Sequence, residues 1–218
     1  MKQKIIFLFL TVLLVSGCEL LPKEADESVF AELEGKTTKE LMRMAQETTD
    51  EDLLRYFARH KEEGVRSDAA KNPNLPEDLQ PKLAEDESWL VRQYMAANRN
   101  ISPSVAAKLS TDLLPEIRWV VAKNPSVPDD ILLGFVEDEN VEVQKKLAQN
   151  TNLSSKMMLE VAKRSSSEAV IDLLRSHTTI SPEVLEELRL RPEVMIQDEL
   201  RQQGLLSEDS EETENPSF

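Results

Sequence analysis

Residues 117–128 read IRWVVAKNPSVP, and this segment sets the architecture because variants of it recur along the chain. Apolar residues stand at Ile117, Val120 and Val121, which is the i, i+3, i+4 spacing of one helix face. Asn124-Pro125 then ends the helix, because a residue before proline is disfavoured in the α region. The related segments are VRSDAAKNPNLP (65–76), VRQYMAANRNIS (91–102) and VQKKLAQNTNLS (143–154), so successive copies are 26 residues apart.

Five columns of residues keep this 26-residue register over four units. A fifth unit starts one residue late at Val170, with His177 in the asparagine column, and a degenerate unit precedes the four at about 39–64. Units of this length cannot bury an apolar face alone, so they predict a solenoid of stacked repeats. The columns are Asn72, Asn98, Asn124 and Asn150; Val65, Val91, Ile117 and Val143; Ala70, Ala96, Ala122 and Ala148; Leu75, Ile101, Val127 and Leu153; and Leu83, Leu109, Phe135 and Val161.

A second helix is expected in each unit. Ser102-Pro103 and Ser181-Pro182 place an N-cap serine before a proline at the first helical position, where the missing N–H costs nothing. Each unit is therefore predicted to be two short helices, or one helix and a 3₁₀ turn, around a shared core. Only five glycines occur in the chain, too few for a β-rich fold with many tight turns.

Two of the units carry a specific set of residues: Val65-Arg66, Ala70, Asn72-Pro73-Asn74-Leu75-Pro76-Glu77, Leu79, Leu83-Ala84 and Asp86, then Ile117-Arg118, Val121-Ala122, Asn124-Pro125, Val127-Pro128 and Asp138. This set resembles the variant leucine-rich repeat, known as LRV, over roughly residues 39–195. The resemblance implies an all-α, right-handed superhelical solenoid of about five to six units, in which α-helices alternate with short 3₁₀ helices. HEAT-like helical repeats are the alternative. Thr151 and Ser155 depart from the LRV pattern, where prolines are usual.

The LRV resemblance implies a fold and no defined activity. Some relatives carry an iron–sulfur module built from a cysteine cluster. This chain has one cysteine, so it cannot hold that module, and no cofactor is expected.

The first residues read as an export signal. Lys2 and Lys4 precede an apolar run from Ile5 to Val15, which at about 1.5 Å per residue is too short to cross a hydrocarbon core of roughly 30 Å. Val15-Ser16-Gly17-Cys18 resembles the lipobox of bacterial lipoproteins, which implies cleavage between Gly17 and Cys18 and lipidation of Cys18. The alternative is an ordinary signal peptide with a chance cysteine.

This interpretation divides the chain into a signal peptide (1–17), a lipidated tether (18–38), a helical solenoid (39–205) and an acidic disordered tail (206–218). Glu19 follows Cys18, which under the sorting rule of Gram-negative lipoproteins favours the outer membrane. Removing residues 1–17 would take two lysines from a chain of net charge −15, leaving −17. Nucleic acid is therefore a poor partner, because phosphate binding needs a basic face.

Several columns could be mistaken for binding sites. The asparagines are expected to satisfy backbone groups in the turns between helices. The arginine column (Arg66, Arg92, Arg118) and the aspartate column (Asp86, Asp112, Asp138) favour salt bridges between repeats or helix caps, with partner recognition by the arginines as the alternative. Tyr94, Trp89 and Trp119 also stand out. Tyr94 and Trp119 are aromatic where other units have polar residues, and such an aromatic either fills a gap in the core or faces a partner.

No catalytic pattern is present. The histidines, His60 and His177, have no second ligand at metal spacing, so neither metal binding nor enzymatic activity is predicted. The sequence favours a membrane-anchored envelope lipoprotein whose solenoid binds a protein or peptide partner. Arg92, Tyr94, Arg118 and Trp119 are the candidate contact residues. A structural spacer without its own ligand is the alternative, and a hydrolase with a hidden site is the least favoured.

Overall fold

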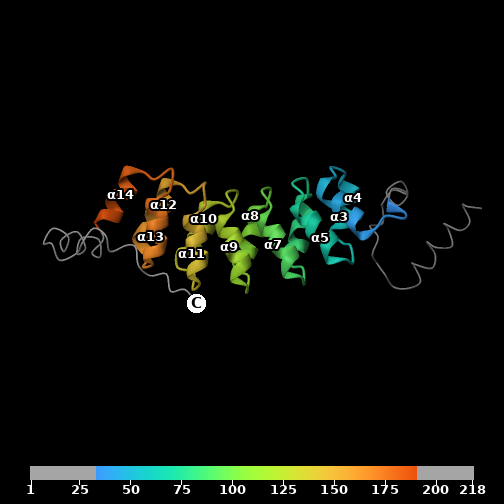
Figure 1. The fold of residues 1–218 in the computed structure, drawn as a ribbon, viewed down its shortest axis with the longest axis horizontal. Helices are drawn as coiled ribbons and strands as arrows, with labels where there is room; N and C mark the ends of the chain where they lie inside the picture. Colours follow the sequence, from blue (N-terminus) through green and yellow to red (C-terminus); the bar gives the residue numbers. More distant parts are fainter. Residues whose placement is uncertain (1–32, 191–218) are drawn as a thin grey trace, which may run out of the picture. The chain divides into compact units, whose positions relative to one another are not determined.

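The computed structural model describes residues 33–190, whose regular secondary structure is all helical, with no β-strand among them. The chain divides after Val127 into two compact units. Figure 1 shows the helices of both. The helices of the first unit are α3 (Thr38–Glu47), α4 (Glu51–Phe57), α5 (Glu63–Lys71), η1 (Glu77–Leu79), α6 (Gln80–Ala84), α7 (Trp89–Ala97), α8 (Pro103–Leu109) and α9 (Pro115–Lys123). Those of the second are α10 (Asp129–Leu132), η2 (Leu133–Phe135), α11 (Val141–Ala148), α12 (Ser155–Arg164), α13 (Glu168–Arg175) and α14 (Pro182–Arg189).

The helix starts follow the period of the sequence. Helices α5, α7, α9 and α11 begin at residues 63, 89, 115 and 141, and η1, α8, α10 and α12 begin at 77, 103, 129 and 155. The all-helical class predicted from the sequence is confirmed for the described residues. The recurring starts make the described part of the chain repeat-like.

The second element of each 26-residue repeat is more often α-helical than the LRV resemblance implied. Helices α8, α12 and α14 are α-helices throughout, and 3₁₀ geometry is confined to η1 and η2 in the described residues. Side-chain capping supports the α-helical form in α8, α12 and α14. Ser102, Ser154 and Ser181 each accept a hydrogen bond from the backbone N–H three residues ahead, which stabilises an α-helical first turn. Pro76, which precedes η1, and Pro128, which precedes α10, offer no such bond.

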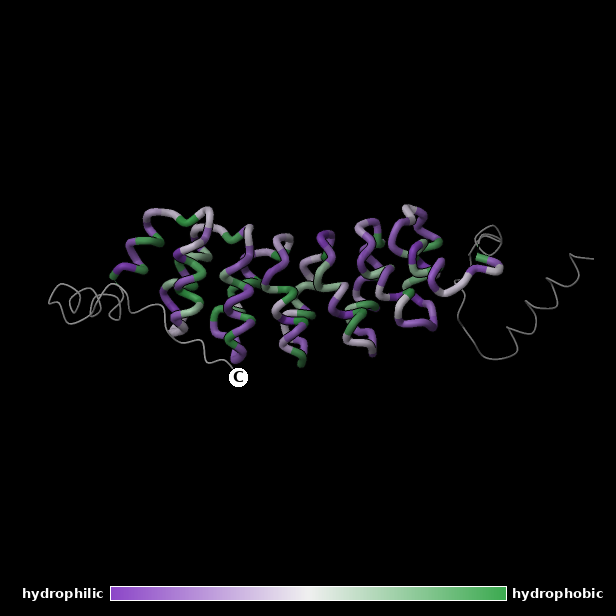
Figure 2. Tube along the Cα trace, in the orientation of Figure 1, coloured by the Kyte–Doolittle hydropathy of each residue, from purple (hydrophilic) through white to green (hydrophobic). Residues whose placement is uncertain are grey.

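The first unit is built from helices that pack in chain order. Helix α5 lies between α3 and α7, α7 packs on α9, and α6 packs on both α7 and α8. Hydrophobic and hydrophilic residues alternate along each helix (Figure 2), so one face of each is turned inward. Val65, Val91 and Ile117 are fully buried there, and burying such a side chain contributes roughly 1.5–3 kcal/mol.

The second unit follows the same scheme. Helix α11 packs on α13, α12 packs on α14, and both α12 and α14 contact α13. Its buried side chains include Phe135, Val143, Val161, Val170 and Val184. No helix in residues 33–190 has the length and apolar character needed to cross a membrane.

Candidate functional site

Asn98, which directly follows α7, shows what the asparagine column does. Its Nδ2 donates hydrogen bonds to the carbonyl oxygens of Ala70 (2.8 Å) and Asn72 (3.0 Å), and its Oδ1 accepts one from the backbone N–H of Asn100 (2.8 Å). The side chain is only 3% exposed. The Ala70 carbonyl lies at the end of α5, where helical hydrogen-bond donors run out. The amide therefore joins two successive turns and has no donor left for a ligand.

The neighbouring asparagines repeat this geometry. Asn72 donates to the carbonyl oxygens of Ala45 and Thr48 at 2.9 and 2.8 Å. Asn124 donates to those of Ala96 and Asn98 at 2.8 and 2.9 Å. In the second unit, the Oδ1 of Asn150 accepts the N–H of Asn152 at 3.0 Å.

Both histidines stand in repeat columns, and each makes hydrogen bonds like those of the residue usually found in its column. His177 stands in the asparagine column: its Nε2 lies 3.0 Å from the Asn150 carbonyl oxygen, and its Nδ1 accepts the N–H of Thr179 at 3.4 Å. His60 stands 26 residues before Asp86, in the aspartate column. Its Nδ1 accepts the N–H of Glu62 at 3.1 Å, as Asp86 accepts that of Ser88. Both rings act as turn caps, and sequence analysis missed the role of His60 although its register reveals it.

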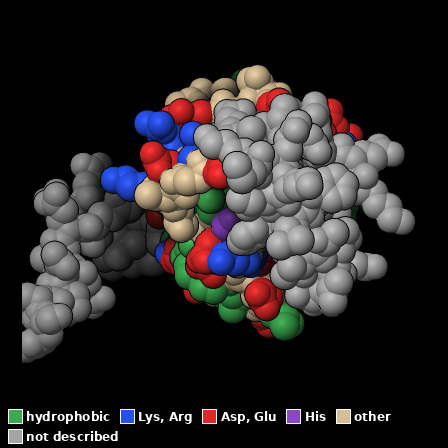
Figure 3. All heavy atoms as spheres, turned by 90° about the vertical axis from the view of Figure 1, so that its right-hand side faces the viewer, with side chains coloured by type: hydrophobic (Ala, Val, Ile, Leu, Met, Phe, Trp, Pro, Cys, Tyr) green, Lys and Arg blue, Asp and Glu red, His purple; other side chains and the backbone are tan. Residues whose placement is uncertain are grey.

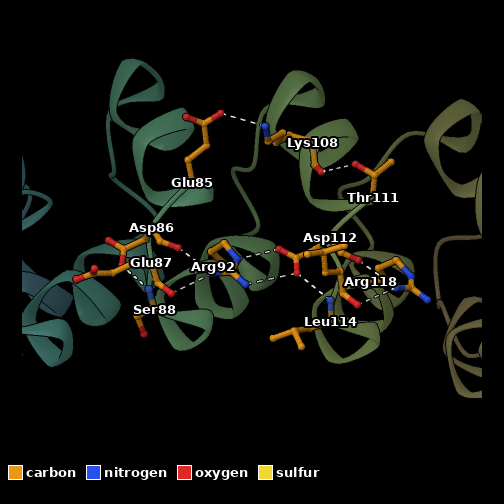
Figure 4. A network of polar contacts seen from close by, with 11 residues as sticks. Glu85, Asp86, Glu87, Ser88, Arg92, Lys108, Thr111, Asp112, Leu114 and Arg118 are labelled. Carbon is orange, nitrogen blue, oxygen red and sulfur yellow. Dashed lines mark hydrogen bonds and ion pairs between the residues drawn. The ribbon is translucent and has the colours of Figure 1, made fainter.

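Two arginine–aspartate ion pairs join neighbouring turns of the first unit, and Figure 4 shows the pair of Arg92 and Asp112. Arg66 binds Asp86 through Nε (2.7 Å) and Nη2 (2.9 Å). Arg92 binds Asp112 through Nε (2.8 Å), and its Nη1 donates to the Asp86 carbonyl oxygen (2.8 Å). The Nη1 of Arg118 donates to the Asp112 carbonyl oxygen at 3.0 Å. Through Nη1, Arg92 and Arg118 thus each hold the turn that precedes their own helix.

The electrostatics of these pairs favour the charged forms. Burial alone would raise the pKa of Asp86, but the hydrogen bonds from Arg66 and from the Ser88 backbone N–H outweigh it, so the pKa lies below its ordinary value. The hydrogen bond to Asp86 likewise raises the pKa of Arg66, against the opposing effect of burial. Asp86 therefore stays ionised and paired at neutral pH.

The four candidate contact residues do not form one exposed strip. The side chain of Arg92 is 18% exposed and Arg118 is 8% exposed, and both guanidinium groups are engaged inside the protein. Tyr94 lies two residues after Arg92, on a different face of α7, and the ammonium of Lys71 sits 3.9 Å from the centre of its ring. Trp119 is half-buried on α9. Arg92 is thus partly exposed, as Tyr94 and Trp119 are, and Arg118 is the one of the four that is buried.

A groove in the first unit combines exposed apolar and charged groups. This groove, of about 430 Å³, lies between the chain after α6 and the chain after α8, and Arg92 and Asp112 are among its lining residues. Lys108 and Glu85 face each other across it, with the ammonium and carboxylate 3.1 Å apart (Figure 4). A smaller groove of about 200 Å³ adjoins it and shares the side chains of Glu85 and Lys108.

Large hydrophobic side chains are exposed beside the groove. Leu113, which lines it, is 93% exposed, and Trp89 is 51% exposed. Trp89 precedes Arg92 by three residues, so the two share a face of α7. In the end-on view of Figure 3, hydrophobic side chains reach the surface among acidic and basic ones. Sequence analysis missed Leu113, although Glu87 and Glu139 occupy its column in neighbouring repeats and mark it as a departure.

No known family model, curated protein or solved structure matches the chain. The predicted cleavage and lipidation site, Gly17 and Cys18, lies outside the described residues. Within residues 33–190, no group of three histidine, cysteine, aspartate or glutamate side chains is placed to hold a metal ion.

Proposed function

We propose that the chain is a lipid-anchored lipoprotein of the bacterial cell envelope, whose helical body binds a protein or peptide partner. The anchor rests on the sequence, in which Lys2 and Lys4, a short apolar run and Val15-Ser16-Gly17-Cys18 follow in the order that lipidation requires. One acyl chain binds membranes only marginally, so two or more chains on Cys18 would provide durable attachment. Glu19 favours the outer membrane.

The body is proposed to be a right-handed LRV-like solenoid. Helix starts at 26-residue intervals support this proposal, as do asparagine side chains that bind the backbone of the preceding repeat, such as the bonds from Asn98 to Ala70 and Asn72. In such a solenoid each repeat contacts mainly its neighbours, and equivalent positions form extended surfaces suited to binding.

The observation that carries the binding role is the exposure of Leu113, which lines the groove, and of Trp89, which lies on the same helix, α7, as the groove residue Arg92. A leucine that is 93% exposed buries almost none of its apolar surface in the fold, and neighbouring repeats have glutamate in its column. Clustered exposed apolar residues with a polar rim are typical of interaction sites, and tryptophan is enriched among interface hot spots. A partner that covers these side chains would gain the burial that the isolated protein lacks.

The spacer function is the second candidate, and the internal engagement of Arg92 and Arg118 favours it. Arginines committed to neighbouring turns stiffen the body without offering a contact. A spacer needs no exposed apolar cluster, so the two candidates differ in what Leu113 does.

The anchor is tested by the variant Cys18→Ser. Acyl chains would supply nearly all membrane affinity of a mature chain with net charge −17, so the variant should leave the membrane fraction of cells. Fractionation followed by immunoblotting measures this. A variant that still sediments with membranes after a high-salt wash would rule out anchoring through Cys18.

The binding role is tested by crosslinking in living cells, with and without the double variant Trp89→Ala/Leu113→Ala. Truncation at hot spots often costs about 2 kcal/mol or more, so the crosslinked species should fall roughly 30-fold or more. The control is Leu185→Ala/Leu190→Ala, which truncates two exposed residues (46% and 58%) in the second unit. Equal yields from the wild type and both variants would favour the spacer.

A further inference from the structure

Leu185, on α14, is exposed at a position where the earlier repeats bury their side chains. It is 46% exposed, and it follows the one-residue shift that begins at Val170. The four residues that stand in its column in the preceding repeats are each at most 2% exposed: Gln80, Ala106, Leu132 and Met158. The column is therefore covered in every earlier repeat and open in the last repeat that the structure describes.

Two more columns open at the same end of the second unit. Ile180 is partly exposed, whereas its equivalents are no more than 6% exposed: Leu75, Ile101, Val127 and Leu153. His177 is partly exposed as well, whereas the four asparagines of its column are at most 5% exposed. The last described repeat is thus open in three columns that are covered elsewhere.

Contacts in the first unit show what covers the column of Leu185. The side chain of Gln80 donates from Nε2 to the carbonyl oxygen of Asn100 (2.8 Å) and accepts at Oε1 the N–H of Ser102 (2.8 Å). This column therefore faces the backbone 20–22 residues further along the chain. The same distance from Leu185 leads to residues 205–207, which are centred on Leu206.

The sequence after α14 keeps the register of the repeats. Ile196, Leu200, Gln203 and Leu206 stand 26 residues after Val170, Leu174, His177 and Ile180, respectively. Apolar residues thus continue the apolar columns, and an amide continues the asparagine column. Residue 194 corresponds to the start of α13, so four residues would link it to the end of α14, as four link α6 to α7.

We propose that residues 194–206 dock on the open end of α13 and α14 in the same chain and close the array of repeats. Leu206 covers Leu185 and Ile180 in this arrangement. The amide of Gln203 donates to the His177 carbonyl oxygen, as that of Asn98 donates to the Asn72 carbonyl oxygen. The inference goes beyond the proposed binding function, because it assigns this apolar end to the chain itself rather than to a partner.

The composition of the segment suits a closing element. Terminal repeats of solenoids need a polar outer face, and the residues between the register positions are polar: Gln197, Asp198, Glu199, Arg201 and Gln202. The short link also favours the chain's own segment over a second copy. It holds the segment near α13 and α14 at an effective concentration of about a millimolar or more, whereas a second copy must arrive from solution.

The test is hydrogen exchange of the purified protein without residues 1–17, read by mass spectrometry. Docking protects backbone N–H groups, so those of residues 198–203 should exchange at least about tenfold more slowly than those of residues 207–218. The protection should be the same at two protein concentrations about a hundredfold apart, because docking within one chain does not depend on concentration.

Two adjacent leucines provide a matched pair of variants. Leu206→Asp should bring the exchange of residues 198–203 to within about twofold of that of residues 207–218, because it places a charge against Leu185. Leu205→Asp should leave the protection within about twofold of the wild type, because its column is exposed in every described repeat: Asn74, Asn100, Ser126, Asn152 and Thr179.

A second pair tests the docking surface from the side of α14. Leu185→Asp should remove the protection of residues 198–203 as Leu206→Asp does. Leu190→Asp is the control, because the equivalents of Leu190 are all exposed: Glu85, Thr111, Glu137 and Lys163. Exchange of α11 should be the same in all four variants, which shows that the rest of the second unit stays folded.

Three results would overturn the proposal. Unprotected residues 198–203 in the wild type would mean that the segment does not dock. Equal effects of Leu205→Asp and Leu206→Asp would mean that it does not follow the register of the repeats. Protection that appears only at the higher protein concentration would mean that a second copy of the chain fills the open end.

Discussion

Replacing Asn98 with alanine removes three hydrogen bonds from the interior of the first unit. The amide donates to the carbonyl oxygens of Ala70 and Asn72 and accepts the N–H of Asn100. The Ala70 carbonyl has no helical substitute, because Pro73 lacks an N–H and Asn74 donates to Asn72. Ala70 is fully buried, so water cannot reach this carbonyl without local opening.

The expected cost follows from these bonds. A typical intramolecular hydrogen bond contributes about 1 kcal/mol net, and a buried group left without a hydrogen bond costs about 1–3 kcal/mol. Three lost bonds, one of which orphans the Ala70 carbonyl, amount to about 3 kcal/mol. Asn98→Asp should cost at least as much at neutral pH, because a carboxylate would face two carbonyl oxygens where the amide donated.

Urea unfolding followed by circular dichroism measures the loss. With a slope of about 2 kcal/mol per molar urea, the midpoint of unfolding should fall by about 1.5 M. The matched control is Asn74→Ala, an exposed asparagine whose replacement should change stability by less than about 0.5 kcal/mol. If Asn98→Ala is no more destabilising than Asn74→Ala, the asparagine column does not hold the repeats together.

Three further predictions follow from the repeats. Deleting residues 91–116 removes one whole 26-residue repeat in register, so circular dichroism should still show cooperative unfolding, with lower stability. Deleting residues 91–103 removes half a repeat and should abolish cooperative unfolding. Equal behaviour of the two deletions would exclude a repeat structure. Arg92→Met should lower the free energy of unfolding by about 2 kcal/mol and Arg92→Lys by nearly as much, because one lysine ammonium cannot bind both Asp112 and the Asp86 carbonyl oxygen as the guanidinium does. Unchanged urea midpoints would contradict this. Burial lowers the pKa of His60, so as the pH falls the unfolded chain binds this proton before the folded chain does. The free energy of unfolding should therefore be constant above about pH 6.5 and decrease below it. His60→Asp should remove the His60 part of this decrease, which urea titrations at several pH values would measure.

The sequence predicted the helices because their determinants are local. The apolar spacing around Ile117, the Asn124-Pro125 terminator and the Ser102-Pro103 start each act within one turn, and helices begin where these signals place them. The short 3₁₀ segments were less predictable, because the same local signal gives different results: η1 after Pro76 is a 3₁₀ helix, whereas α10 after Pro128 begins as an α-helix.

The groove could not be predicted from the repeat pattern. A repeat reveals what its units share, whereas Leu113 and Trp89 matter because they differ from their equivalents in other units. The sequence also could not show whether Arg92 is free or paired, because Asp112 lies 20 residues away and the contact depends on how two turns pack. The arginine column was therefore predicted as a possible binding surface, although the guanidinium groups of Arg92 and Arg118 bind groups inside the protein.

Site-specific photo-crosslinking in intact cells tests the proposed binding function most directly. A photoreactive amino acid at position 113 replaces the most exposed of the large hydrophobic side chains in the described residues, and the same amino acid at position 185 is the control. The proposed function predicts a discrete adduct from position 113, strongly reduced by Trp89→Ala, and none from position 185. No adduct from position 113, or equal adducts from both positions, would contradict a binding site at this groove.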